Sequence, residues 1–594
     1  MDDSSSKCGY DSPRALWACL AVALVLGLST LGMGFALDDN LHLLIFEGRW
    51  PLGSPMDLFR FAGGDAEGMR RIVQEGPYPW WTLPELKIAF WRPLSSALET
   101  LDYRLFGRNA VGYHVHSVLW YLGVVALFGG LLRRVMPGSL AVLALLLFAV
   151  DDAHLLPVGW ISNRNALVST ALALVGLWMH LEWREAGKRW ALPVSLVALA
   201  ASLTAGESAL GVFAYVLAYE LSGARGTVAE RLRAVAPAAV LAVAYLGVYK
   251  ALGYGAYGSA MYLDPVGEPG RYLVAALGRV PALIGGLVGV PVDLWGIILA
   301  SRPALVALGV AGLAVLVVLV RSAWPGLSEE EQRHSRWLAV GALLSLLPVT
   351  SSMPMGRLLF VPSLGASVLL AVVLRHAWRS RARGWRPRGM AVAGAVLALF
   401  HLVLAPLSWP AMSMMIRQLG TGSVELARKV RGELDPARIA SQRVVVLEAR
   451  DIGVLLYIPV HWALEGQVLP RSWWPLAMVQ ESPIVTRTGP NSLALELPNG
   501  GHFLATEAEQ TLRSPEHMLA RGAEVKLEGM RVTVLAADAQ GPTRLGFEFD
   551  VPLEDPSLVF LRWQEGTLRR FTPPPEGKQV DLSAVAGGPE ARPL

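Results

Sequence analysis

The stretch GFALDDNLHLL, from Gly34 to Leu44, places two adjacent aspartates directly after a long apolar run. The run begins near Ala15 and has about twenty residues, which at ~1.5 Å per residue is enough to cross a bilayer. Carboxylates are costly inside hydrocarbon, and those found at the edge of a span often mark a functional site. We therefore expect Asp38 and Asp39 to lie where a first membrane-spanning segment reaches its surface.

The composition of the whole chain is that of a membrane protein. Of its 594 residues, 53% are hydrophobic and only 17% are charged, which excludes an ordinary soluble globule. The formal net charge of +4 is small for this length and gives no reason to expect a nucleic-acid partner. Cys8 and Cys19 are the only cysteines, so the sequence has neither a disulfide framework nor a cysteine-based metal site.

Eleven apolar runs predict a mainly α-helical, polytopic transmembrane fold with about 11 spans. We interpret the first run as an uncleaved anchor, because it is long for a signal peptide, although Gly34 and Ala36 lie where small residues would precede a cleavage site. The runs cover residues 15–37, 112–132, 138–150, 166–182, 190–205, 208–222, 234–253, 303–320, 337–351, 357–377 and 389–408.

Basic residues gather in alternate loops between these runs. By the positive-inside rule, those loops are cytoplasmic, which predicts a cytoplasmic N-terminus, an extracytoplasmic C-terminus and an outward-facing Asp38–Asp39 pair. The basic loops carry Arg133 and Arg134; Arg184, Lys188 and Arg189; Arg225, Arg231 and Arg233; Arg321, Arg333 and Arg336; and the block from Arg375 to Arg388.

The segment from 271 to 300 does not fit this alternation, because one extra crossing would move the block from Arg375 to Arg388 outside. We interpret it as an interfacial or re-entrant segment broken at Pro281 and Pro291. A pair of short spans is the alternative, and a single full span is the least favoured.

After Trp409 the pattern changes to apolar alternation with a period of two, which is typical of half-buried strands. The segment from Val424 to Pro436 predicts a short connecting helix. We therefore divide the chain into a transmembrane domain (1–408), a linker helix (409–440) and an extracytoplasmic β-rich domain (441–594). The alternating positions are Leu493, Leu495 and Leu497; Val525 and Leu527; Val532 and Val534; and Leu545, Phe547 and Phe549.

Several polar clusters fall in the loops predicted to face outward. Each one alone is also what a solvated helix end or a structural ion pair would give, so none decides function by itself. The clusters are Asp38-Asp39-Asn40; Trp91-Arg92-Pro93 with Asp102, His114 and His116; Asp151-Asp152-Ala153-His154; Asn163-Arg164-Asn165; Gly206-Glu207; and Arg357.

The order of these clusters resembles the GT-C superfamily of membrane glycosyltransferases, in particular the protein O-mannosyltransferase-like branch with the TMTC proteins and their bacterial relatives. The resemblance covers roughly residues 15 to 408. The matching segments are LDDN (37–40), RPL (92–94), LDYRLFG (101–107), GYH (112–114), His154 with VGWISNR (158–164), Glu207, and RLLFVPSLG (357–365).

Five positions depart from the family pattern. Gly206 replaces a lysine before Glu207, Ala166 stands where an acidic residue is usual, and Gly356 stands where a glutamate precedes the arginine. Asp151-Asp152 replaces a His-Pro pair, and a β-rich domain follows in place of a TPR array.

The resemblance implies an inverting transfer of a sugar from a polyprenyl-phosphate carrier to an extracytoplasmic acceptor. Such a reaction needs a general base beside the acceptor hydroxyl and cations on the leaving phosphate. Asp38 or Asp39 fits the base, while the other orients it or binds metal, because adjacent residues point in different directions. Guanidinium groups suit the phosphate, which makes Arg92, Arg164 and Arg357 its candidates. Asp102, His154 and Glu207 complete the predicted substrate-binding set.

Several alternatives stay open. A divalent metal ion is one of them, since neither His114 with His116 nor Asp151 with His154 forms a specific ligand pattern. The chain is also compatible with a non-catalytic scaffold whose β domain binds envelope partners, because it lacks the family's lysine. A transporter or flippase is less favoured, since no inverted repeat is visible. The sequence specifies neither the sugar nor the acceptor, which is a protein, a lipid or a glycan.

Overall fold

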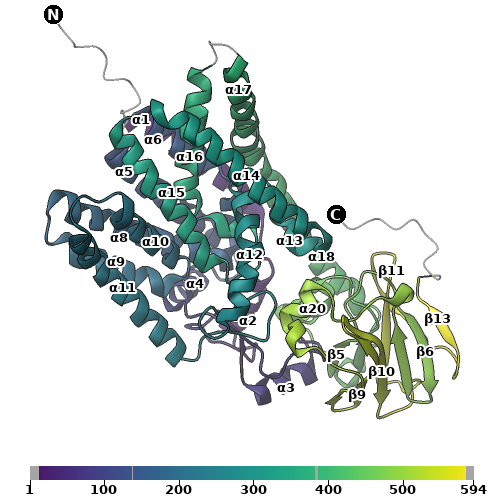
Figure 1. The fold of residues 1–594 in the computed structure, drawn as a ribbon. Helices are drawn as coiled ribbons and strands as arrows, with labels where there is room; N and C mark the ends of the chain where they lie inside the picture. Colours follow the sequence, from purple (N-terminus) through teal and green to yellow (C-terminus); the bar gives the residue numbers. More distant parts are fainter. Residues whose placement is uncertain (1–12, 137, 381–384, 584–594) are drawn as a thin grey trace, which may run out of the picture.

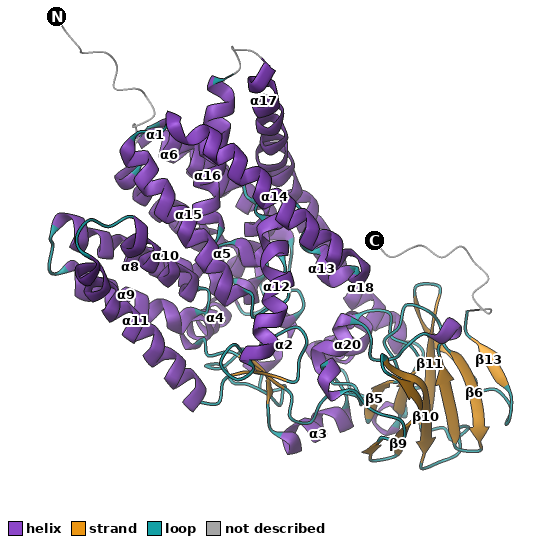
Figure 2. Cartoon of the chain, viewed as in Figure 1, coloured by secondary structure: helices purple, strands orange, loops and turns teal. Residues whose placement is uncertain are grey.

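The computed structural model describes residues 13–136, 138–380 and 385–583. A bundle of helices forms one part of the molecule, and a β-rich region that follows it in sequence lies beside one of its ends (Figures 1 and 2). The β-rich C-terminal region predicted from the alternating residues is therefore confirmed, and so is the mainly helical character of the chain.

The eleven predicted apolar runs all fall on helices of the bundle. Six segments are long and apolar enough to cross a membrane, or seven if the bent pair Ser139–Val150 and Asp152–Gly159 is one span. They indicate an integral membrane protein. The helices are α1 (Pro13–Leu28), α5 (Ala110–Val135), α6 (Ser139–Val150), α8 (Asn165–Ala186), α9 (Ala191–Ala205), α10 (Ala209–Ser222), α11 (Val228–Ala251), α14 (Arg302–Ala323), α15 (Glu329–Val349), α16 (Ser363–Arg379), α17 (Trp385–Ala398) and α18 (Ala405–Arg431).

The predicted number of about 11 spans is not confirmed. Helices α9 and α10 show the physical reason, since they have only 15 and 14 residues. At ~1.5 Å per residue each is about 22 Å long, which is less than the ~30 Å hydrocarbon core of a bilayer.

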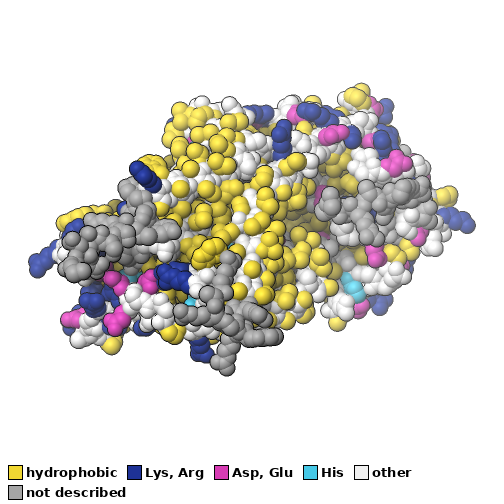
Figure 3. Space-filling model, turned by 90° about the horizontal axis from the view of Figure 1, so that it is seen from above, with side chains coloured by type: hydrophobic (Ala, Val, Ile, Leu, Met, Phe, Trp, Pro, Cys, Tyr) yellow, Lys and Arg dark blue, Asp and Glu magenta, His cyan; other side chains and the backbone are white. Residues whose placement is uncertain are grey.

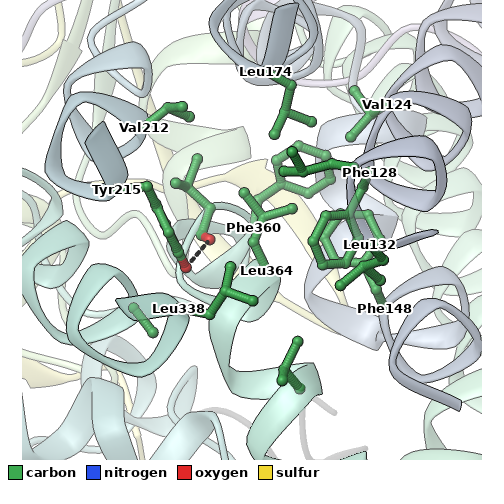
Figure 4. Close-up of a cluster of buried hydrophobic side chains, with 14 of the residues drawn as sticks. Val124, Phe128, Leu132, Phe148, Leu174, Val212, Tyr215, Leu338, Phe360 and Leu364 are labelled. Carbon is green, nitrogen blue, oxygen red and sulfur yellow. Dashed lines mark hydrogen bonds between the residues drawn. The ribbon is translucent and has the colours of Figure 1, made fainter. Parts of the chain in front are cut away.

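Aromatic and aliphatic side chains fill the middle of the bundle (Figure 4). The ring centroids of Phe128 on α5 and Phe148 on α6 lie 4.8 Å apart, and Phe360 packs on the same cluster. The outer faces are also apolar: Val243 on α11 and Val318 on α14 are exposed. Seen from above, hydrophobic side chains cover much of the middle of the molecule, and Lys and Arg lie mainly toward its margins (Figure 3). Such a surface suits lipid rather than water.

One end of the bundle, which we call the paired end, holds arginines from several of the predicted basic loops. Arg134 at the end of α5 pairs with Glu182 of α8, and Arg375 near the end of α16 pairs with Glu331 at the start of α15. Glu220 of α10 joins the same end through Arg184 of α8, at 2.7 Å. These loops therefore share one end, as the sequence predicted. Positions 381–384 of the block from Arg375 to Arg388 lie outside the described residues.

The predicted break at Pro281 is wrong. Helix α12 (Pro269–Gly286) runs through this proline, while Pro291 lies in the loop before α13 (Leu294–Ile297). A proline inside a helix removes one hydrogen bond, and close packing here offsets that loss. A Cβ atom at Gly309 of α14 would lie only 1.8 Å from the Pro281 carbonyl oxygen, so the two helices approach each other at glycine.

The loops at the other end of the bundle carry short elements that the sequence analysis did not predict. Three strands from two distant loops form an antiparallel sheet in the order β1-β2-β3. These elements are α2 (Asp38–Phe46), β1 (Arg60–Gly63), α3 (Ala66–Glu75), β2 (Lys87–Ala89), α4 (Pro93–Phe106), α7 (Leu155–Gly159) and β3 (Gly255–Tyr257).

Two sheets make up the C-terminal region. One has six antiparallel strands in the order β13-β6-β7-β10-β9-β8, and it buries the alternating positions, such as Leu493, Val532 and Phe547. The other has the order β12-β11-β4-β5, with β11, β4 and β5 parallel. The elements are β4 (Arg443–Val446), α19 (Ile458–Leu464), β5 (Ser472–Pro475), β6 (Ile484–Gly489), β7 (Ser492–Glu496), α20 (Glu507–Leu512), β8 (Glu524–Leu527), β9 (Met530–Asp538), β10 (Gly541–Phe549), β11 (Leu558–Gln564), β12 (Thr567–Arg570) and β13 (Gln579–Asp581).

Two contacts tie the C-terminal region to the bundle. The helix predicted from Val424 to Pro436 is not separate, because α18 continues from Ala405 through two glycines to Arg431; a glycine costs only ~1 kcal/mol in a helix interior. The loop from 59 to 90 also shares a hydrophobic core with the C-terminal strands. In that core the indole nitrogen of Trp80 donates to the Leu476 carbonyl at 3.0 Å.

Candidate active site

A cavity of about 230 Å³ lies at the end of the bundle opposite the paired end. Helices α8, α10 and α16 end at or near the paired end. Residues at or just before the start of each of these helices line the cavity, which places it at the opposite end. Four of the predicted site residues line it together, from four segments far apart in sequence: Asp38, Arg92, Glu207 and Arg357. The rest of the wall is mainly aromatic and aliphatic, with Phe59, Phe61, Phe90, Trp160, Tyr245, Tyr249, Tyr262 and Leu358.

Asp38 is the first residue of α2, which lies outside the candidate spans. The preceding Leu37 has a φ of 48°, an unfavourable backbone conformation for leucine that turns the chain sharply into the helix. The Asp38 carboxylate accepts a hydrogen bond from the Tyr457 hydroxyl at 3.2 Å, so the C-terminal region contacts a residue of the cavity wall. Burial raises the pKa of Asp38, while His42, the Tyr457 bond, Arg357 and Arg92 act in the opposite direction. The net shift is upward.

Asp39 is placed differently, since it is 2% exposed and does not line the cavity. One carboxylate oxygen accepts from the Ser162 backbone at 2.8 Å and from its hydroxyl at 2.5 Å, and the other accepts from the Ala36 backbone at 3.0 Å. Burial raises the pKa of Asp39 to about 7. The carboxylate therefore fastens the start of α2 to the loop before α8, and only Asp38 of the pair faces the cavity.

His42 supports the same turn of α2 and was not predicted. Its Nδ1 atom lies 2.6 Å from a carboxylate oxygen of the buried Glu99 on α4. Burial lowers the pKa of His42, but Glu99 and the two aspartates raise it more, and the net shift is upward. A histidine four residues after an aspartate on a helix lies on the same face, which places the His42 ring one turn from Asp38.

Arg92 and Glu207 form an ion pair on the cavity wall. The Arg92 Nε donates to Glu207 at 2.7 Å, and its guanidinium lies over the rings of Phe90 and Phe59 at 4.6 and 4.8 Å. The rings of Phe90 and Phe59 hold the Arg92 guanidinium in place. The predicted arginine is therefore at the cavity, with its charge balanced by the neighbouring glutamate.

Arg357 is the cation of this wall whose charge is not balanced in place. Its Nη1 donates to the Asn163 side chain at 3.3 Å, and its guanidinium lies 5.0 Å from the centre of the Trp160 ring. Its Nε atom is buried without a hydrogen-bond partner, and within residues 13–136, 138–380 and 385–583 no carboxylate pairs with it. An anion entering the cavity would find this guanidinium available.

The structure does not bring Asp102, Arg164 and His154 to the cavity wall. Asp102 and Arg164 are buried and pair with each other at 2.5 Å, with His116 at 2.7 Å from the same aspartate. His154 is fully buried, with Nε2 2.9 Å from the Ser363 hydroxyl and its ring against Phe360. These groups connect elements behind the cavity wall.

The candidate metal ligands of the sequence can also be located in the structure. Among the described residues no group of three or more His, Cys, Asp or Glu side chains is arranged to hold a metal ion. His114, which the sequence left as an open candidate, donates from Nε2 to the Gly34 carbonyl at 3.0 Å, just before the aspartate pair. It therefore orients the end of the first span.

Two features of the cavity have no signal in the sequence. Tyr457 is 419 residues from the aspartate that it contacts, and nothing in its neighbourhood marks it. Lys250 lines the far part of the cavity and pairs with Asp264, although neither belongs to a motif. By contrast, Asn163 lies in a predicted polar cluster, so its presence at the wall could have been expected.

Comparison with known proteins gives two partial sequence relatives. The protein O-mannosyl-transferases Tmtc1 and Tmtc2 of Drosophila melanogaster are each 29% identical to this chain, over 213 and 230 residues. These matches cover 35% and 36% of this chain and 22% and 23% of the relatives, so the chain spans about a fifth of the length of the curated relatives it matches. The predicted resemblance to the TMTC proteins is confirmed. No family model matches the chain.

Solved structures with a similar arrangement have low sequence identity to this chain. ArnT from Cupriavidus metallidurans bound to undecaprenyl phosphate is 13% identical, with a TM-score of 0.40, over 89% of this chain and 97% of that one. The oligosaccharyltransferase AglB from Archaeoglobus fulgidus, in complex with an inhibitory peptide and a dolichol-phosphate, is 11% identical, with a TM-score of 0.40, over 78% and 65%.

Proposed function

We propose that the protein is a membrane glycosyltransferase that moves a sugar from a polyprenyl-phosphate carrier to an acceptor hydroxyl outside the cytoplasm. The observation that carries this proposal is the convergence of Asp38, Arg92, Glu207 and Arg357 on one cavity. Transfer from a phosphate to a hydroxyl needs a general base and positive charge on the leaving phosphate, and this set supplies the carboxylate of Asp38 and the guanidinium groups of Arg92 and Arg357. The relatives named as protein O-mannosyl-transferases support the same class of reaction.

In the proposed mechanism Asp38 is the general base. Its carboxylate takes the proton from the acceptor hydroxyl, whose oxygen then bonds to the anomeric carbon from the side opposite the phosphate. The bond from that carbon to the phosphate oxygen breaks, its electron pair stays on the phosphate, and the configuration inverts. The pKa of Asp38 is raised by burial, and a carboxylate with a higher pKa is a stronger base.

Arg357 is the proposed partner of the leaving phosphate. The negative charge on that group grows as the bond breaks, and a guanidinium already held in place beside it stabilises this charge. Arg92 lies on the same wall, held by Glu207 at 2.7 Å, and contributes a second positive charge near the donor. Asp39 has a positioning role, since its three hydrogen bonds fix the helix that presents Asp38.

Asp102, Arg164 and His154 are then supports of the site. The Asp102–Arg164 pair joins α4 to the loop before α8, and His154 joins α7 to the start of α16. Loss of either contact would act on transfer through the shape of the cavity rather than through the substrate.

The orientation of the chain is part of the proposal. We place the paired end in the cytoplasm, because its basic loops follow the positive-inside rule, and the cavity and C-terminal region outside. Single cysteines can test this in a chain with Cys8 and Cys19 replaced. A cysteine at Arg531 should react with an impermeant reagent in intact cells, and one at Arg189 should react only after lysis. The reverse pattern would overturn the orientation.

The activity itself is tested with purified protein in nanodiscs, supplied with a polyprenyl-phosphate mannose and a panel of peptide, lipid and glycan acceptors. Transfer with loss of the carrier-linked sugar supports the proposal. A folded protein that transfers nothing from any carrier-linked sugar would contradict it and favour the non-catalytic scaffold, which the missing lysine before Glu207 also fits.

A further inference from the structure

A second cavity, of about 530 Å³, lies beside the first, at the junction between the bundle and the C-terminal region. Leu263 lines both cavities, but none of the four charged residues of the candidate active site lines the second one. The second cavity opens between α12, the start of α14 and α20. Its lining includes Arg271, Val274, Arg279, Trp295, Arg302 and Glu507.

Arg279 carries a positive charge in this wall without a matching negative one. It is 7% exposed, and its two Nη atoms donate to the Thr350 and Ala260 carbonyls at 3.1 and 2.9 Å. In the described part of the chain it pairs with no carboxylate, and the charges of two other arginines, Arg302 and Arg271, act on it. A buried charge without a counter-charge is destabilising, and an anion in the cavity would offset this cost.

The two other arginines of the cavity have partners from the C-terminal region. Arg302 pairs with Glu507 and lies 5.2 Å from the centre of the Trp295 ring. Arg271 pairs with Glu516 at 2.8 Å and also with Glu268 next to it. Arg271 and Arg302 are thus paired with carboxylates, and Arg279 is the arginine of this lining that pairs with none among the described residues.

The mouth of the cavity lies next to an apolar outer surface. Val274 lines the cavity yet is 72% exposed, and Leu273 and Leu277 on the same helix are 64% and 77% exposed. Arg302 begins a candidate span, so this position is at the boundary of the membrane. A ligand that suits both features has an anionic group for the arginines and hydrocarbon for the exposed face.

We propose that this cavity binds the phosphate head group of an anionic membrane lipid, with the acyl chains along the outer faces of α12 and α14. The lipid neutralises Arg279 and fills the junction where Glu507 and Glu516 hold the C-terminal region on the bundle. This role does not depend on sugar transfer, and it holds equally for an enzyme or a scaffold.

The test uses the purified full-length protein after removal of bound lipid. Phosphatidylglycerol, phosphatidylcholine or inorganic phosphate is added, and the melting temperature and the lipid retained in native mass spectra are measured. We expect phosphatidylglycerol to be retained and to raise the melting temperature, and the other two to do neither. An equal effect of phosphatidylcholine would overturn the proposal, and an equal effect of inorganic phosphate would overturn the assignment to a lipid.

Substitutions test whether phosphatidylglycerol binds at the second cavity. Arg279→Gln should weaken phosphatidylglycerol retention about tenfold, because one hydrogen-bonded charge is lost, and Arg279→Lys should restore part of it. Val274→Glu is a second variant at an exposed position that spares the fold and repels an anion at the cavity mouth. Arg336→Gln is the matched control, since Arg336 is exposed about two turns from the start of α15 and does not line the second cavity. Wild-type retention in both Arg279→Gln and Val274→Glu would overturn the proposal.

Discussion

At the paired end, Glu220 accepts hydrogen bonds from both His180 and Arg184, and Glu331 accepts from Arg375. At the cavity end, the Arg357 guanidinium contacts the Asn163 amide and the Trp160 ring, and no described carboxylate forms an ion pair with it. Helices α8, α10 and α16 run between the two ends, and arginines lie at both. The difference is that charges at the paired end are satisfied within the protein, whereas the cavity end keeps a charge available to a ligand. Satisfied charges hold the helices together, and the available one points to chemistry.

The largest effect on transfer is expected for Asp38→Asn. The change keeps the size of the side chain but removes its basicity, so turnover should fall by ~10²–10⁴-fold. The melting temperature should change little, because the carboxylate accepts one hydrogen bond from the described residues, that of Tyr457. The matched variant Asp39→Asn should instead lower the melting temperature, since its carboxylate accepts three. Wild-type turnover in Asp38→Asn would remove this residue from the mechanism.

Arg357→Ala should have the next largest effect. Loss of the cation opposite the leaving phosphate is expected to lower kcat/KM by ~10²–10³-fold. The control is Arg375→Ala at the paired end, which removes an arginine that is already bound to Glu331 at 2.6 Å. That variant should melt earlier with little change in kcat/KM. If the two variants lost the same activity, the contrast between the ends would be wrong.

Tyr457→Phe should reduce transfer about fivefold, the value of one net hydrogen bond near 1 kcal/mol. Burial sets the raised pKa of Asp38 and the Tyr457 bond opposes it, so losing the bond raises that pKa further. The base acts only when deprotonated, and therefore the acid limb of the pH profile of kcat/KM should move to higher pH. An acid limb that stays in place, or moves to lower pH, would contradict the link between this tyrosine and the base.

Glu220→Gln should have the smallest effect on transfer, within twofold of wild type, because it lies far from the cavity. Its cost is in stability, on the order of 1–3 kcal/mol, since a buried carboxylate with three charge-assisted hydrogen bonds is replaced by an amide. Thermal unfolding in detergent measures this. A strong loss of turnover in a protein that remains folded would show that the paired end also serves the reaction.

The sequence predicted the elements that depend on local pattern. The long apolar runs became helices, and alternating residues such as Val532 and Val534 became a buried strand face, because burial fixes the period of a helix or strand. The Pro281 prediction failed for a tertiary reason, the close approach of α14 at Gly309. The short strands β1, β2 and β3 were missed because three or four residues carry no readable period.

The candidate site was predicted only in part, because motifs mark residues but do not show what those residues contact. Asp38, Arg92, Glu207 and Arg357 stand within motifs and do meet at one cavity, although their roles remain predictions. Asp102 and Arg164 stand in motifs as well, but they bind each other, and a sequence does not show whether two charges face a ligand or one another. Tyr457 comes from a region without motif similarity, so only the folded chain brings it to Asp38.

The bond from Trp80 to Leu476 has a consequence for how the protein is made. It joins residues 396 positions apart, and at ~5–20 residues per second a ribosome needs roughly 20–80 s to cover that distance. During this interval most of the bundle can insert into the membrane, while the loop from 59 to 90 still lacks the strands that cover its tryptophans. The wall of the cavity that includes Phe59, Phe61 and Phe90 is therefore completed last. A chain cut short before β5 would keep its membrane helices and never acquire a finished site.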